Sequence, residues 1–275
     1  MSDIRLLQLQ PGQPICINRK IHDSEIKARQ AAFVDRFSQG CNGRLTSYQE
    51  ALLHPLDHPW CIRGMKFTAA VNHCWQTGRT FYYIDNGYIG NISSKIYFRI
   101  VKNHIHDIRD IIDRPRDRLD QCQYTIKKFS SGKKILIAPP SEKSLSMWNM
   151  NPEVWVNEVV TELKKYTNRP IEIRLKRPRN DRLKVDTMEE ALADDVHCLI
   201  TYNSVSAVES VMLGKPAIVL GPNAAQAVCS TSLAEIECPR IPTDDERESW
   251  LRHLSYSQFT FSEMSNGTAW KILNQ

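Results

Sequence analysis

The sequence lacks the long apolar runs that cross membranes. No stretch of about 18 consecutive apolar residues occurs among its 275 residues, so no transmembrane helix is predicted. Its start, Met-Ser-Asp-Ile-Arg, carries an acid and a base where a secretion signal needs an apolar stretch. We therefore expect a cytoplasmic protein that has no membrane partner.

The sequence also lacks closely paired cysteines. Its eight cysteines are scattered and form no CxxC pair, so the spacing supports neither a structural zinc site nor a disulfide framework. Several lie in apolar runs, which predicts reduced thiols in a core. Internal repeats are absent as well. With 41% hydrophobic and 24% charged residues, the composition is that of a globular protein with one large or two small α/β domains.

The formal net charge of +5 is unevenly distributed. Residues 91–136 contain eleven Lys or Arg against five Asp or Glu, and residues 169–184 contain seven against two. Such segments indicate contact with phosphates or a polyanion, and a solvated surface of mixed charge is the alternative. Aromatic residues alternate with basic ones in the first segment, as they do in nucleic-acid grooves. The candidate acceptor- or DNA-binding residues are Arg99, Lys102, Arg114, Arg116 and Arg118.

One stretch, residues 197–221, places a polar turn and a short helix between two buried strands. Its apolar ends are typical of parallel strands, and a Gly-Lys-Pro turn ends the predicted helix. Backbone N–H groups at such a strand-to-helix turn bind phosphate, and a capped helix without a ligand is the alternative. Glu209 is predicted to lie within reach of a nucleoside hydroxyl. The other candidate ligand-binding residues here are Asn203, Ser204 and Ser206.

Strands and helices alternate from residue 134 to residue 221, which predicts a doubly wound parallel sheet. Ligands of such sheets bind outside the carboxyl ends of the strands. Polar and basic residues follow the predicted strands 134–138 and 170–175, where they could offset phosphate charge. These further candidates are Ser141, Lys143, Ser144, Arg174 and Lys176.

The first half contains one informative strand end. An aromatic run over residues 81–84 leads into Asp85-Asn-Gly, a turn signal. A carboxylate at the carboxyl end of a strand can deprotonate a hydroxyl group, which makes Asp85 a candidate general base. An Asx turn or a hairpin turn is the alternative. The two His-Pro pairs within residues 54–59 predict an extended loop rather than a metal site, because no further ligand follows at a usual spacing.

Two motifs resemble those of a known enzyme class. Asn203-Ser-x-Ser-x-x-Glu209 with the following Leu-Gly-Lys-Pro-Ala, and Ile84-Asp-Asn-Gly-Tyr88, are similar to segments of GT-B nucleotide-sugar glycosyltransferases. The resemblance is to the capsule polysaccharide biosynthesis proteins, which include Kdo transferases. Many of those proteins have Glu in place of Asp85 and His-Pro in place of Arg177-Pro178. Nucleotide-sugar epimerases share much of the first motif.

The resemblance implies an α/β fold of two Rossmann-like domains, with a parallel sheet in the C-terminal half. We predict an acceptor-side domain at 1–130, a linker at 130–133, a nucleotide-sugar-binding domain at 134–255, and a terminal helix at 256–275 that crosses back.

The resemblance also implies a metal-independent glycosyltransferase without a cofactor. In this hypothesis Asp85 deprotonates the acceptor hydroxyl, while helix amides and basic side chains stabilise the leaving nucleotide. The compact, basic chain resembles a phage-type enzyme that acts in the host cytoplasm on hydroxymethylated bases of double-stranded DNA. A capsular or cell-surface glycan is the alternative acceptor. A non-catalytic nucleotide- or nucleic-acid-binding module of the same fold is the alternative function.

Overall fold

The computed structural model describes residues 8–17, 28–64, 67–90, 96–175, 187–193 and 195–275. It divides into two compact units. Unit 1 comprises Met1–Ile105 with Ser255–Gln275, and unit 2 comprises His106–Leu254. Unit 2 is therefore an insertion in unit 1, and the chain passes between the units twice. The predicted linker at 130–133 differs from this division, which places residues 106–130 in unit 2.

Unit 1 is built on a mixed sheet whose described strands have the order β10-β5-β4-β3-β1-β2. Strands β1 to β4 run parallel, whereas β5 pairs antiparallel with β4, and β10 antiparallel with β5. Buried apolar residues dominate β1, β3 and β4, as in strands covered on both faces. The strands are β1 (Ile15–Ile17), β2 (Arg44–Thr46), β3 (Trp60–Arg63), β4 (Phe81–Asn86), β5 (Phe98–Lys102) and β10 (Gln258–Phe259).

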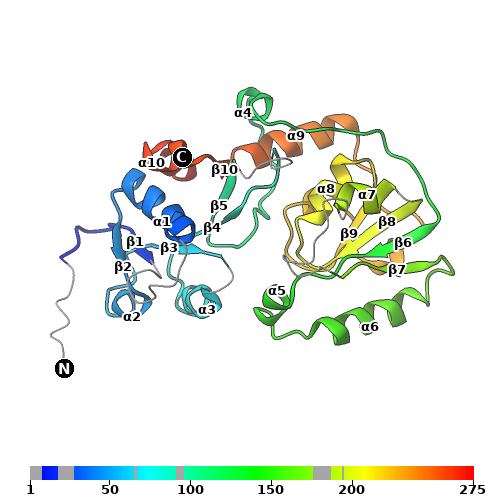
Figure 1. Cartoon of the computed structure of the whole chain (residues 1–275), viewed down its shortest axis with the longest axis horizontal. Coiled ribbons are helices and arrows are strands. Elements are labelled where there is room, and N and C mark those ends of the chain that lie inside the picture. The colour runs from blue at the N-terminus through cyan, green and yellow to red at the C-terminus, as the bar shows by residue number, and fades with distance from the viewer. Residues whose placement is uncertain (1–7, 18–27, 65–66, 91–95, 176–186, 194) are drawn as a thin grey trace. The chain divides into compact units, whose positions relative to one another are not determined.

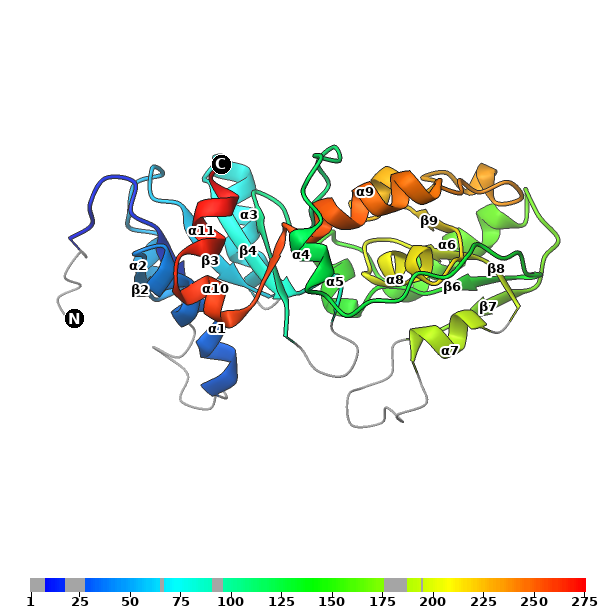
Figure 2. The ribbon, with the colours of Figure 1, turned by 90° about the horizontal axis from the view of Figure 1, so that it is seen from above.

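Helices from both ends of the chain meet in the core of unit 1. Helix α1 packs against α10 and α11 of the C-terminal segment (Figures 1 and 2). The ring of Phe33 in α1 lies 4.6 Å from that of Phe98 and 5.0 Å from that of Phe261, between centroids. The C-terminal segment is thus part of this core. The helices are α1 (Ala28–Gly40), α2 (Tyr48–Ala51), α3 (Thr68–Thr77), α10 (Phe261–Ser265) and α11 (Thr268–Leu273).

Unit 2 contains a parallel sheet whose described strands have the order β7-β6-β8-β9. Together with the parallel strands of unit 1, this sheet confirms the predicted fold class, α/β with a parallel sheet in the C-terminal half. The strands are β6 (Lys134–Ile137), β7 (Ile171–Ile173), β8 (Val196–Thr201) and β9 (Ala217–Val219).

Helices cover both faces of the unit 2 sheet: α6 lies on one face, and α7 and α8 lie on the other (Figure 1). Helix α6 begins with Asn151, whose side chain caps the N–H groups of Glu153 and Val154, and with Pro152 in its first turn. The helices are α4 (Asp117–Asp120), α5 (Glu142–Ser146), α6 (Pro152–Leu163), α7 (Met188–Ala193), α8 (Ser206–Met212) and α9 (Asp244–Ser255), with short 3-10 helices at Gln226–Val228 and Leu233–Glu235.

Hydrogen bonds explain why the segment before residue 130 belongs to unit 2. The Lys127 N–H donates to the carbonyl of Met212 at the end of α8 (2.8 Å), and the Ser130 N–H donates to that of Gly214 (3.0 Å). Buried Arg247 of α9 donates to the Lys127 carbonyl (2.8 Å). The segment 127–130 is therefore attached through its backbone to α8, to the turn after α8 and to α9.

Both sheets reverse their direction of growth once. In unit 2 the chain goes from β6 to β7, and then to β8 on the opposite side of β6. In unit 1 it goes from β1 to β2, and then to β3 on the opposite side of β1. In open parallel sheets, ligands bind at such a reversal, outside the carboxyl ends of the two central strands. Candidate ligand sites therefore lie after β6 and β8, and after β1 and β3.

Candidate functional site

Polar side chains converge at the carboxyl ends of β6, β8 and β9 in unit 2. The Ser144 hydroxyl, in α5 after β6, donates to Oδ1 of Asn203, two residues after β8 (2.8 Å). The Ser206 N–H donates to Oγ of Ser204 (3.2 Å), which forms the turn into α8. Asn223, after β9, donates from Nδ2 to the Ser204 carbonyl (3.0 Å). We call these five residues the carboxyl-end cluster.

Two groups of the carboxyl-end cluster are buried without a partner. Asn203 is 3% exposed and Ser206 is 5% exposed, and neither Asn203 Nδ2 nor Ser206 Oγ has a hydrogen-bond partner among the described residues. A buried polar group left unpaired costs about 1–3 kcal/mol. Such groups are rare in native structures unless a ligand, water or ion completes them. Both groups can donate a hydrogen bond to an anionic oxygen.

An aromatic wall adjoins the cluster. Tyr202, between β8 and Asn203, has its ring centroid 6.0 Å from that of Trp148 and 6.4 Å from that of Trp155. A Cβ at Gly221 would lie 2.5 Å from the Tyr202 ring, so only glycine fits there. The turn after β9 is thus packed directly on this wall, which gives the cluster a firm support.

Four donors surround the carboxylate of Asp85 at the end of β4 in unit 1. Its Oδ1 accepts hydrogen bonds from Arg63 Nη1 (3.0 Å) and the Asn86 N–H (2.8 Å). Its Oδ2 accepts one from the Tyr83 hydroxyl (3.1 Å) and lies 3.5 Å from Arg99 Nη2. The Asp85 side chain is 19% exposed. The sequence predicted the carboxylate at a strand end but not these partners.

The two arginines set the charge state of Asp85. Burial raises the pKa of its carboxyl, but the charges of Arg99 and Arg63 outweigh this effect and lower the pKa to about 2. Arg99 is 5% exposed and is fixed by hydrogen bonds to the carbonyls of Ile105 (3.0 Å) and Asn86 (2.8 Å). Asp85 is therefore an anion at neutral pH, and a weak base while these partners remain in place.

The turn after Asp85 is anchored by a residue from the C-terminal segment. The side-chain oxygen of fully buried Gln258 accepts hydrogen bonds from the N–H groups of Tyr88 (2.8 Å) and Ile89 (2.9 Å). A Cβ at Gly87 would lie 2.9 Å from the Tyr97 carbonyl oxygen, which explains the glycine. Asp85 and Asn86 are thus the last residues of β4, and the bend that follows them is held by the C-terminal segment.

The other predicted donor-binding residues are dispersed in unit 2. Ser141 begins α5 without a side-chain cap, and Lys143 lies exposed on that helix. Arg174 follows β7, and Glu209 is an exposed residue of α8. Lys176 lies outside the described residues. Of the predicted donor-binding residues, Ser204 and Ser206 are thus joined by a hydrogen bond, and Asn203 is bonded to Ser144.

The basic residues predicted to bind DNA are divided between the units. Arg99 and Lys102 lie in unit 1, and Arg114, Arg116 and Arg118 lie in unit 2. Arg99 is buried beside Asp85, and Arg116 pairs with Asp120 (2.7 Å) and Glu248 (2.9 Å). Acidic partners therefore offset part of the charge that the sequence suggested for a phosphate backbone.

The Gly-Lys-Pro turn lies at the amino end of β9, whereas the carboxyl-end cluster follows the strands. Gly214 has a φ of +73°, and a Cβ there would lie 2.2 Å from the Lys128 carbonyl oxygen. Buried Lys215 donates from Nζ to the Ser130 carbonyl (3.4 Å). This part of the motif thus holds the segment 127–130 in place within unit 2.

Arg63 and Asn223 were not among the predicted site residues, whereas Ser144 was predicted, with Ser141 and Lys143, to meet a donor phosphate. Arg63 ends β3 beside Asp85, Ser144 follows β6, and Asn223 follows β9. Arg63 ends a buried strand, and Asn223 belongs to the segment that follows one, which is the signal that could have found these two residues.

The His-Pro segment is organised by an arginine. Arg79 is 3% exposed and donates to the carbonyls of His54 (2.7 Å), Pro55 (2.8 Å) and His58 (2.8 Å). Among the described residues, no group of three or more His, Cys, Asp or Glu side chains could hold a metal ion. Within the same ranges, no helix has both the length and the apolar character needed to span a bilayer.

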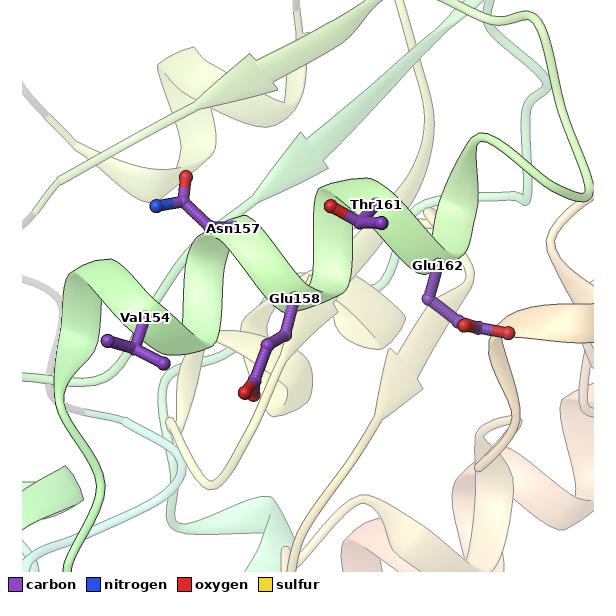
Figure 3. Close-up of a pocket in the computed structure, with 5 residues that line it drawn as sticks. All are labelled: Val154, Asn157, Glu158, Thr161 and Glu162. Carbon is purple, nitrogen blue, oxygen red and sulfur yellow. The ribbon is translucent and has the colours of Figure 1, made fainter.

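A shallow pocket on α6 is separate from both sites. Its described lining residues, Val154, Asn157, Glu158, Thr161 and Glu162, all belong to that one helix (Figure 3). None of them follows a strand of the sheet, which is where ligands of parallel sheets bind.

The chain matches no protein-family model and no curated protein. It is similar to two solved structures from Thermosulfurimonas dismutans. One is the KpsC β-Kdo 2,4 transferase, with a TM-score of 0.47 and 10% identity over 89% of this chain and 91% of that chain. The other is the KpsC β-Kdo 2,7 transferase, with a TM-score of 0.49 and 13% identity over 91% and 97%. Both TM-scores are below 0.5, so the proposals rest on the residues of this chain.

Proposed function

We propose that the chain is a GT-B glycosyltransferase that moves a sugar from a nucleotide-sugar donor to an acceptor hydroxyl. The observation that carries this proposal is the pair of buried, unpartnered groups Asn203 Nδ2 and Ser206 Oγ at the switch point of the unit 2 sheet. In doubly wound sheets nucleotides bind at the switch point, and two such donors suit the oxygens of a phosphate group.

In the proposed reaction the donor occupies unit 2 and the acceptor occupies unit 1. The cluster hydroxyls and amides, with Lys143, Arg174 and Lys176 as candidate charges, stabilise the leaving nucleotide without a metal. Glu209 is proposed to orient the ribose. Asp85 takes the proton of the acceptor hydroxyl as that oxygen bonds to the anomeric carbon and the bond to the nucleotide breaks.

A glycan is the proposed acceptor. The pairing of Arg116 with two acids and the burial of Arg99 leave less positive charge for a DNA backbone than the sequence suggested. Hydroxymethylated DNA stays a prediction that the same assay tests. Transfer to DNA that weakens steeply with salt would favour it over the glycan.

The test begins with calorimetric binding of UDP-, GDP-, CMP- and ADP-sugars, and continues with transfer assays on glycan and DNA acceptors. We expect one nucleotide to bind, with an affinity that falls in an Asn203→Ala variant. We also expect Asp85→Asn to abolish transfer while donor binding remains. A protein that binds a nucleotide but never transfers or hydrolyses its sugar would be a binding module. Absence of binding to all four donors would refute the proposal.

A further inference from the structure

Arg63 occupies the switch point of the unit 1 sheet. It is the last residue of β3, one of the two strands between which that sheet reverses its direction. Its Nη1 donates to Asp85 Oδ1 (3.0 Å) and to the Ile84 carbonyl (3.4 Å). Its guanidinium carbon lies 4.3 Å from the centroid of the Phe33 ring. The side chain is 21% exposed, so it is held in place but not sealed off.

One edge of this guanidinium is unused. Nε is buried without a partner, and Nη2 donates no hydrogen bond to any described residue. The Nε–Nη2 edge is the fork that binds carboxylate and phosphate oxygens in pairs. Arg109 in unit 2 shows the filled form: its Nε and Nη2 reach the two oxygens of Asp107 at 2.8 and 2.6 Å.

Other buried arginines differ from Arg63 in this respect. Arg79 and Arg247 also bury an Nε without a partner among the described residues, but both of their terminal nitrogens are bonded. Those of Arg79 reach loop carbonyls, and those of Arg247 reach carbonyls and Asp244. Both therefore serve to hold backbone. Arg63 instead ends β3 with an Nε–Nη2 edge that has no hydrogen-bond partner among the described residues.

The charge balance around Asp85 favours a second anion. Two guanidinium groups, of Arg63 and Arg99, face one carboxylate, so the group carries a net positive charge. Arg99 is fully engaged by two carbonyls and Asp85. Arg63 is therefore the cation that can be shared with a ligand.

We propose that the Nε–Nη2 edge of Arg63 binds an oxyanion, a carboxylate or a phosphate ester, carried by the sugar acceptor. This inference rests on the proposed function for the acceptor itself. An oxyanion on this edge shares the positive charge that otherwise faces Asp85, so the carboxylate becomes a stronger base when an acceptor is bound. Arg63 is thus a binding residue for the acceptor and a positioning residue for Asp85.

The test follows the Arg63 Nε–H signal by NMR in ¹⁵N-labelled protein. The signal is assigned through its loss in Arg63→Lys and its contacts with the Phe33 ring. Glucuronate and glucose 6-phosphate are titrated against uncharged glucose, with sodium chloride at matched ionic strength. We expect a saturable shift with a charged sugar and none with glucose or chloride. A shift with glucuronate alone identifies a carboxylate, and one with glucose 6-phosphate alone a phosphate ester.

Variants give the second measurement. Arg63→Lys keeps the charge but loses the fork, so charged-sugar affinity should fall at least about tenfold. Arg36→Lys, an exposed arginine of α1, is the matched control and should bind as the wild type does. If the Nε–H signal ignores all sugars, or responds equally to glucose, the inference is wrong.

Donor binding separates this inference from the proposed function. Arg63→Lys should bind the nucleotide sugar as tightly as the wild type, because the carboxyl-end cluster lies in unit 2. If the protein binds a donor and transfers its sugar while the Arg63 Nε–H signal does not respond to any sugar, this inference is refuted and the proposed function stands. If no donor binds and no sugar is transferred, the proposed function fails whatever Arg63 does.

Discussion

Replacing Ser206 by alanine should have opposite effects on stability and on ligand binding. Its hydroxyl is buried and unpartnered among the described residues, so the free protein carries an unpaired polar group that costs about 1–3 kcal/mol. Alanine removes that group at the expense of a very small cavity. We expect the free energy of unfolding of unit 2 to rise by about 1 kcal/mol, which raises the Tm by about 2–4 °C for a domain of this size class.

Nucleotide affinity should fall in the Ser206→Ala variant, although its stability rises. If Ser206 Oγ donates to a phosphate oxygen, its loss removes a hydrogen bond to a charged group, worth about 1.5–3 kcal/mol. The Kd for the nucleotide should then increase by about 10- to 150-fold. Scanning calorimetry measures the Tm, and titration calorimetry measures the Kd.

Ser210 of the same helix is the matched control. It is also fully buried, but its hydroxyl donates to the Lys215 carbonyl (3.0 Å). Ser210→Ala should therefore lower the stability by about 1 kcal/mol and leave the nucleotide affinity unchanged. If Ser206→Ala lowers the Tm as Ser210→Ala does, and binds the nucleotide as the wild type does, the assignment of an incomplete site is wrong.

Three further changes test the surrounding structure. The pKa of Asp85, about 2 in the folded protein, lies below its unfolded value, so its pairing stabilises the fold above about pH 4. That contribution, about 2 kcal/mol, is lost as the pH falls towards 2, and acid titration of Asp85→Asn should show a correspondingly shallower loss of stability. Gly214→Ala should cost more than the roughly 1 kcal/mol of backbone strain expected for Gly12→Ala, because only the former meets the Lys128 carbonyl; urea unfolding measures both. Arg79→Lys should lower the free energy of unfolding by about 2–4 kcal/mol, since one ammonium replaces a fork that binds three carbonyls; an unchanged urea midpoint would contradict this role.

Short sequence patterns predicted the strands and turns that are formed by residues close together in the chain. The apolar strands from residue 134 onward and the polar turn at 203–206 are visible as short runs, and the structure has them where expected. The predicted boundary at 130–133 differs from the division between the units, which follows Ile105. Segment 127–130 is held in unit 2 by hydrogen bonds to residues far along the chain, and such bonds leave no periodic pattern of apolar residues in the sequence.

Tertiary contacts account for what the sequence could not reveal at the candidate sites. Asp85 was visible as an acid at a strand end, but its arginine partners come from β3 and β5. Arg99 was predicted to bind an acceptor or DNA, as an exposed basic residue would. A sequence shows that a residue is basic but does not show that it is buried. The unpartnered state of Asn203 and Ser206 likewise depends on which neighbours surround them in space.

The insertion of unit 2 into unit 1 fixes an order of assembly during synthesis. Residues 106–254 are continuous, so every residue of unit 2 is made before Ser255–Gln275. Unit 1 must wait for that segment, because α10 and α11 cover α1 and Gln258 anchors the turn after Asp85. A chain that ends at residue 254 would therefore contain every residue of unit 2 and a unit 1 whose apolar α1 face is uncovered, and such a face favours aggregation.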